Sequence, residues 1–186
     1  MSVNVPTDNL TIGDHTVEFY AVDNIANRGT VRLLRFAKIS LDSIAIEFGN
    51  PVAVSNGITF ISSQTPVTVS TPYTSLKVQY QIVEGSNAPA DDKWISSNSN
   101  SITFTVPNTL SDGPYTIYYR AFSGNKFGSA KSIQLRLDNT PPSIDINIDD
   151  GAIIMDGDVI TITATDDGSG VARIFYRIDG GEWVSA

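Results

Sequence analysis

The chain has 186 residues, with 12 Lys and Arg against 20 Asp and Glu, so its formal net charge is −8 at pH 7. It contains no cysteine, which excludes a disulfide-stapled scaffold and a cysteine-ligated metal site, and its acidic balance argues against nucleic acid as a partner. The length fits one or two domains, and a hydrophobic content of 41% is enough for a core.

The first residues, Met-Ser-Val-Asn-Val-Pro, combine neither a basic stretch nor an apolar one, so they are not expected to form a signal peptide. No apolar run approaches the roughly 20 residues that a membrane-spanning helix needs. We therefore expect no membrane span, and any secretion signal or anchor would be encoded elsewhere.

Apolar and polar residues alternate at period two through most of the chain, and clusters of Gly, Pro, Asn, Asp and Ser interrupt them roughly every 8–12 residues. In residues 76–82 the even positions are apolar and the odd ones polar, so one strand face is buried and the other is solvated. The pattern predicts an all-β fold made of immunoglobulin-like antiparallel β-sandwiches. Strands of the central sandwich are expected at residues 44–48, 58–61, 66–70, 76–82, 94–96, 101–106, 115–122 and 132–137.

An internal repeat with a period of about 100 residues changes how the length is interpreted. A shift of about 96 residues aligns 76–82 with 172–178, and a shorter loop then brings Trp183 to the place of Trp94. The repeat predicts that residues 1–41 are the second half of a module, 42–141 a complete module and 142–186 the first half of a third. At the period of about 100, four N-terminal residues match identical ones: Leu10 and Leu110, Gly13 and Gly113, Thr16 and Thr116, Ala21 and Ala121.

Two stretches resemble a known family. Residues 166–183 resemble the central part of bacterial immunoglobulin-like tandem repeats of OmpL47-type surface proteins, and residues 15–27 resemble the closing hairpin of the same repeats. Residues 115–121 of the middle module are also similar to the penultimate strand of fibronectin type III domains. The resemblance implies a secreted or cell-surface multimodular bacterial protein, in which such repeats act as spacers, adhesive stalks or accessory modules beside a glycan-active domain.

His15 is the single histidine, so acid–base or nucleophilic catalysis would have to centre on it. The repeat places His15 where the next module has Tyr115, and an aromatic there often bonds a nearby backbone group in a tyrosine corner. No nucleophile elbow, phosphate loop or dinucleotide motif occurs. We therefore expect a structural role for His15 and no enzymatic activity.

An acidic stretch at residues 145–151 partly resembles a calcium loop, because oxygen-bearing side chains recur at alternate positions. It lacks the glycine and glutamate spacing of an EF-hand, and its isoleucines fit the buried face of a strand, so a solvated strand edge is the favoured interpretation. The remaining hypothesis is calcium at the module junction. The residues assigned to it are Asp138, Asn139, Asp149 and Asp150.

Outward-facing aromatic side chains are the best indication of a binding surface, because flat rings stack on sugars. The same rings can instead cover a sheet edge or a neighbouring module. The candidates are Tyr20, Tyr118, Phe122 and Phe175 on strands, with Trp94 and Trp183 near a loop.

The leading functional prediction is a non-catalytic spacer segment in a secreted or surface-displayed protein; the alternative is a carbohydrate- or host-ligand-binding adhesion module. The predicted partners are neighbouring immunoglobulin-like modules of a longer chain. Because half modules leave sheet edges open, strand exchange between them is a further hypothesis. Exchange within one chain is awkward, because the middle module would hold the halves apart, whereas exchange between chains would build filaments or a ring.

Overall fold

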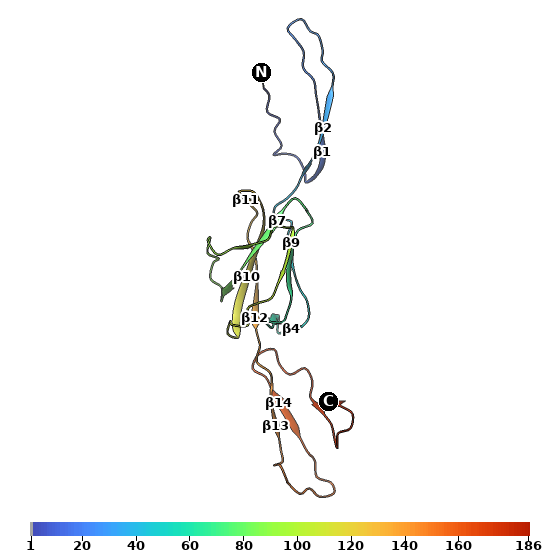
Figure 1. Cartoon of the computed structure of the whole chain (residues 1–186), viewed down its shortest axis with the longest axis vertical. Coiled ribbons are helices and arrows are strands. Elements are labelled where there is room, and N and C mark those ends of the chain that lie inside the picture. Colours follow the sequence, from blue (N-terminus) through green and yellow to red (C-terminus); the bar gives the residue numbers. More distant parts are fainter. Residues whose placement is uncertain (1) are drawn as a thin grey trace.

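The computed structural model describes residues 2–186, which contain strands and turns and no helix. The all-β prediction is therefore confirmed. The molecule is elongated, with an N-terminal segment at one end, a sandwich in the middle and a C-terminal segment at the other end (Figure 1). No helix in this described range offers a candidate bilayer span.

Two sheets form the middle sandwich. The larger sheet has the order β4-β5-β12-β10-β7-β8, with β11 paired to β10, and the smaller sheet has the order β3-β6-β9. All pairings are antiparallel except that between β12 and β5. The strands of the larger sheet are β4 (Val52–Ser55), β5 (Ile58–Ile61), β7 (Lys77–Glu84), β8 (Ile95–Ser96), β10 (Gly113–Ser123), β11 (Lys126–Phe127) and β12 (Lys131–Leu137). Those of the smaller sheet are β3 (Ala45–Phe48), β6 (Val67–Ser70) and β9 (Ser101–Phe104).

The core of the sandwich lies between these two sheets. Val69 from the smaller sheet and Val78 from the larger one are both fully buried, and they belong to one packed cluster. A second cluster continues the core, with Val67 packed against Ile117. The alternation of the sequence has thus directed one face of each strand inward, as sheet packing requires.

The N-terminal segment is a hairpin of β1 (Gly13–Phe19) and β2 (Arg32–Lys38), with Gly13 opposite Lys38 and Phe19 opposite Arg32. The Asp23 carboxylate closes its tip by accepting hydrogen bonds from the backbone N–H groups of Ile25 and Asn27. Hydrogen bonding from the Asn27 backbone, and then from its side chain, lowers the pKa of Asp23. The carboxylate is therefore held in its ionised form.

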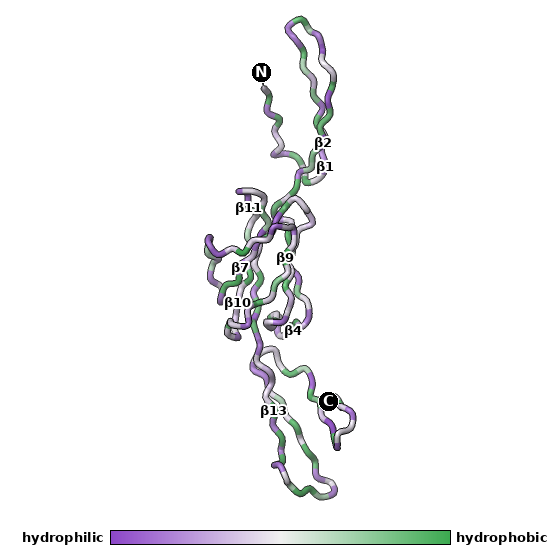
Figure 2. The backbone as a smooth tube through the Cα atoms, viewed as in Figure 1, coloured by the Kyte–Doolittle hydropathy of each residue, from purple (hydrophilic) through white to green (hydrophobic). Residues whose placement is uncertain are grey.

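The C-terminal segment contains two short hairpins and little core. The first is β13 (Ser143–Ile146) with β14 (Ile162–Thr165), and the second is β15 (Phe175–Tyr176) with β16 (Val184–Ser185). Hydrophobic stretches run along both terminal segments (Figure 2), and their large apolar side chains are mostly exposed. The apolar faces of the two terminal segments are thus largely uncovered.

The same kind of side-chain hydrogen bond to the backbone occurs in the N-terminal segment and in the middle sandwich. The His15 ring donates a hydrogen bond to the Thr11 carbonyl at 2.8 Å, and the Tyr115 hydroxyl donates one to the Ser111 carbonyl at 2.9 Å. Both bonds reach back four residues to the backbone, as expected for an aromatic at this corner. His15 therefore has the structural contact that its position in the repeat predicts.

Candidate functional site

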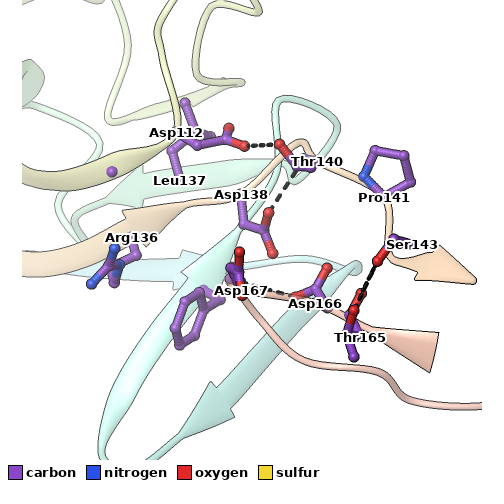
Figure 3. A pocket seen from close by; sticks show the side chains of 13 residues that line it. Asp112, Arg136, Leu137, Asp138, Thr140, Pro141, Ser143, Thr165, Asp166 and Asp167 are labelled. Carbon is purple, nitrogen blue, oxygen red and sulfur yellow. Dashed lines mark hydrogen bonds between the residues drawn. The ribbon is translucent and has the colours of Figure 1, made fainter. Parts of the chain in front are cut away.

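A cavity of about 410 Å³ lies at the junction between the middle sandwich and the C-terminal segment (Figure 3). Its walls come from the turn before β10, the end of β12, the linker that follows β12 and the loop after β14. Four aspartates from these elements face it: Asp112, Asp138, Asp166 and Asp167.

Asp112 fixes the linker from the side of the sandwich. Its carboxylate accepts hydrogen bonds from the Asn139 backbone N–H at 2.8 Å and from the Thr140 hydroxyl at 2.6 Å. The Thr140 hydroxyl is the main reason why the pKa of Asp112 lies below its usual value, and the Asn139 backbone and side chain contribute. The ionised carboxylate therefore favours the observed path of the linker.

Asp138 fixes the same linker from the side of the C-terminal segment. Its carboxylate accepts a hydrogen bond from the Ser169 backbone N–H at 2.6 Å and lies directly over Gly168. A Cβ atom on Gly168 would overlap this carboxylate, so a larger residue there would displace the Asp138 side chain from its hydrogen bond to Ser169. Asp166 holds the loop itself, accepting from the N–H of Gly168 and from that of Gly170.

Asn139 links the junction to a third element. Its side-chain oxygen accepts a hydrogen bond from the Ser63 backbone N–H at 2.7 Å, in the turn between β5 and β6. The carboxylate and amide oxygens at this junction thus accept hydrogen bonds from the protein. These hydrogen bonds tie the linker to the sandwich on one side and to the C-terminal segment on the other.

The four residues assigned to calcium lie in two places. Asp138 and Asn139 are at the junction, whereas Asp149 and Asp150 are in the connection between β13 and β14. Within residues 2–186, no group of three or more His, Asp or Glu side chains is placed so that it could hold a metal ion. The structure therefore does not bring these four residues together.

The other junction, between the N-terminal hairpin and the sandwich, is mainly apolar. Ile39 and Leu41 pack against the core of the sandwich. A Cβ atom on Gly128 would lie 2.5 Å from the Leu41 carbonyl oxygen, so this loop also needs glycine for close approach. The Asp42 carboxylate accepts a hydrogen bond from the Ser129 backbone N–H at 2.7 Å, which adds a polar tie.

The six aromatic candidates are divided among the three parts of the molecule, and arginines stack on several of them. Arg120 lies 4.2 Å from the ring centre of Trp94, Arg28 lies 4.0 Å from that of Tyr20, and Arg177 lies 4.8 Å from that of Trp183. The remaining candidates are Tyr118 and Phe122 on β10, both half-buried, and the exposed Phe175 on β15. The residues that sequence reasoning missed are Asp112 and the glycines Gly128 and Gly168, whose importance depends on contacts with distant loops.

A scan against protein-family models and a search of curated proteins found no match to this chain.

Proposed function

We propose that this chain is a non-catalytic spacer segment of a secreted or surface-displayed multimodular bacterial protein, built from tandem immunoglobulin-like modules. The observation that carries the proposal is that specific contacts fix both junctions of the middle sandwich. At one junction Gly128 packs on Leu41, and at the other Gly168 packs on Asp138. A spacer holds the domains on either side of it at a fixed distance only when such junctions are stiff.

The arrangement along the molecular axis supports a rod. The chain enters the sandwich at one end and leaves it at the other, so successive units extend in one direction (Figure 1). Pro141 and Pro142 follow Asp138 in the linker of the second junction and restrict the backbone there. The net charge of −8 makes neighbouring rods repel one another and keeps them soluble.

The resemblance of residues 166–183 and 15–27 to bacterial immunoglobulin-like repeats supports the class of protein. The recurring backbone contact of His15 and Tyr115 is consistent with related modules. On this proposal the terminal segments are half modules, and the sandwich between them is a complete one.

A distance measurement between two spin labels tests the stiffness directly. The chain has no cysteine, so Gln134→Cys on β12 and Thr163→Cys on β14 give one unique labelled pair across the second junction. With unlabelled chain in excess, we expect one narrow distance distribution, which Gly168→Val broadens about twofold or more. The control Ser169→Ala keeps the backbone donor and should leave the width unchanged. A wild-type distribution as broad as that of the Gly168 variant would refute the rod.

A second candidate function is carbohydrate or host-ligand binding. It is favoured by three aromatic side chains that are exposed to solvent. Tyr20 is 52%, Phe175 54% and Trp183 60% exposed. Affinity electrophoresis against a panel of glycans tests it, with Trp183→Ala as the variant and Ile153→Ala, also exposed, as the control. Retardation that only Trp183→Ala abolishes would support binding.

A further inference from the structure

Each strand of the terminal segments lies in a two-stranded sheet and so has an unpaired edge, and two of these edges belong to β1 and β15. β1 is paired on one side by β2, and β15 is paired on one side by β16. An unpaired edge presents a row of backbone donors and acceptors to which another strand can add. We propose that β1 of one copy of this chain pairs antiparallel with β15 of a second copy, so that the two terminal segments together complete one sandwich. This inference rests on the modular repeat in the proposed function.

The middle sandwich supplies the template for the pairing. There β10 is flanked by β12 on one side and by β7 on the other, and β7 is in turn flanked by β8. The β1–β2 hairpin reproduces the β10–β12 pair, since Gly13 lies opposite Lys38 as Gly113 lies opposite Leu137.

The β15–β16 hairpin reproduces the other pair of the template. Tyr176 lies opposite Val184 as Tyr80 lies opposite Ile95. The backbone N–H of Ala186 also bonds the carbonyl of Ile174 at 2.9 Å, as that of Ser97 bonds the carbonyl of Val78 at 2.9 Å. Among the strands β12, β10, β7 and β8 of the template, the one pairing that the terminal segments lack is the pairing between β10 and β7.

The template also fixes the register. In the sandwich, Tyr119 lies opposite Tyr80 and Ile117 opposite Ile82. Transferred through the repeat, this register gives eight cross-strand pairs, and the four at its centre are Phe19 with Tyr176, Val17 with Ile178, Glu18 with Arg177, and Tyr20 with Phe175.

The four central pairs are chemically matched. Two pairs are aromatic, one is aliphatic, and Glu18 with Arg177 joins opposite charges, all of which stabilise antiparallel strands when directly opposite. A slip of one residue would place the Glu18 carboxylate opposite an apolar residue and turn each face away from its partner. The complementarity therefore selects a single register.

Exposure in the free chain shows what the pairing would cover. Phe19 is 48% exposed, whereas its counterpart Tyr119 is 8% exposed, and Ile178 is 71% exposed. Covering these faces removes apolar area from water, which is the main favourable term in association.

Charge favours the second copy as the occupant. Residues 142–186 contain nine Asp and Glu and two Arg, a net charge of −7, whereas residues 1–41 contain four of each sign and are neutral. The strand β2, which pairs with the other edge of β1, contributes Arg32, Arg35 and Lys38. In the proposed pairing, the basic residues of β2 in one copy therefore lie near the acidic C-terminal segment of the other copy.

The two segments of one chain lie at opposite ends of the sandwich, so they cannot meet each other (Figure 1). The contact is therefore heterologous, and it propagates head to tail into a filament or closes into a ring.

Two complementary blocking variants test this proposal in the full chain. Phe19→Asp places a charged side chain on β1, and Tyr176→Asp places one on β15. Each variant leaves the other strand unchanged. We expect the wild-type mass in light scattering to rise with concentration, and each variant alone to remain at the 20.0 kDa of one chain. In an equimolar mixture of the two variants, the particle mass should reach that of two chains and should not rise further with concentration. The controls are Ile25→Asp and Ile153→Asp, both at exposed positions outside the register, and they should associate like wild type.

The other outcomes overturn the inference. A monomeric wild type whose β1 amide hydrogens exchange rapidly would show that these faces stay open, and a monomer with protected β1 amides would show pairing within one chain. Association that survives both blocking variants would indicate non-specific contact. None of these results alters the spin-label distance across the second junction, so failure here is distinguishable from failure of the spacer proposal.

Discussion

The middle sandwich should unfold as a cooperative unit to which the N-terminal hairpin contributes little. Val69 is 0% exposed in the core, whereas Val17 on β1 is only half-buried, so Val→Ala at the two positions makes the same chemical change in different environments. Removing two methyl groups from the core costs about 1.6 kcal/mol in transfer free energy, and the residual cavity adds about 1 kcal/mol. Val69→Ala should therefore lower the unfolding free energy by about 2.5 kcal/mol, or the Tm by about 10–20 °C.

Val17→Ala should change the same transition by less than about 0.5 kcal/mol, which is typical of substitutions away from a packed core. Urea unfolding followed by tryptophan fluorescence measures both effects. Trp183→Phe leaves Trp94 as the single reporter of the sandwich, and Tyr176→Asp blocks association so that β1 gains no partner. An equal loss of stability in the two alanine variants would refute the reasoning, because the hairpin would then belong to the cooperative core.

Three further predictions concern the interface and the two junctions. Glu18→Arg should suppress the concentration-dependent mass, and mixing it with Arg177→Glu should restore association; no restoration would exclude the proposed register. The lowered pKa of Asp112 means that its contribution is present above the unfolded value of about 3.9 and is lost as the pH falls through the folded pKa. The spin-label distribution should therefore broaden only as the pH falls below about 3.9, while Asp112→Asn should remove this dependence, and a width that does not respond to pH would contradict the role of Asp112 in holding the linker. Gly128→Ala should lower the urea midpoint by the equivalent of about 1–3 kcal/mol, because the new Cβ would meet the Leu41 carbonyl.

Periodicity was sufficient to find most of the sandwich. The predicted strands at 58–61 and 66–70 correspond to β5 and β6, with at most one residue of difference at either end. β4 was missed, although Asn56 and Gly57 after it are a strong hairpin signal, and both have positive φ as a type I′ turn requires. β11 has two residues, too few for any periodic pattern to reveal.

The junction could be predicted only in part. The proline-containing linker predicted that Asp138 and Asn139 lie between modules, and the structure places both in the connection between β12 and β13. Asp112 gave no such signal, because an aspartate before a glycine is common in turns. Its role depends on Thr140, which is close in space and distant in sequence.

The repeat also explains why the two junctions are built differently. At the period of about 100 residues, Ile12 occupies the place of Asp112, so the linker after β2 has no counterpart of the Asp112 carboxylate. The Lys38 ammonium group is at that end instead, and it donates to the backbone carbonyls of Thr7 at 3.1 Å and Leu10 at 2.8 Å. The Asp112 carboxylate loses its charge in acid, which weakens its hydrogen bonds to Asn139 and Thr140. Acid should therefore loosen the linker at the second junction, where these hydrogen bonds hold it.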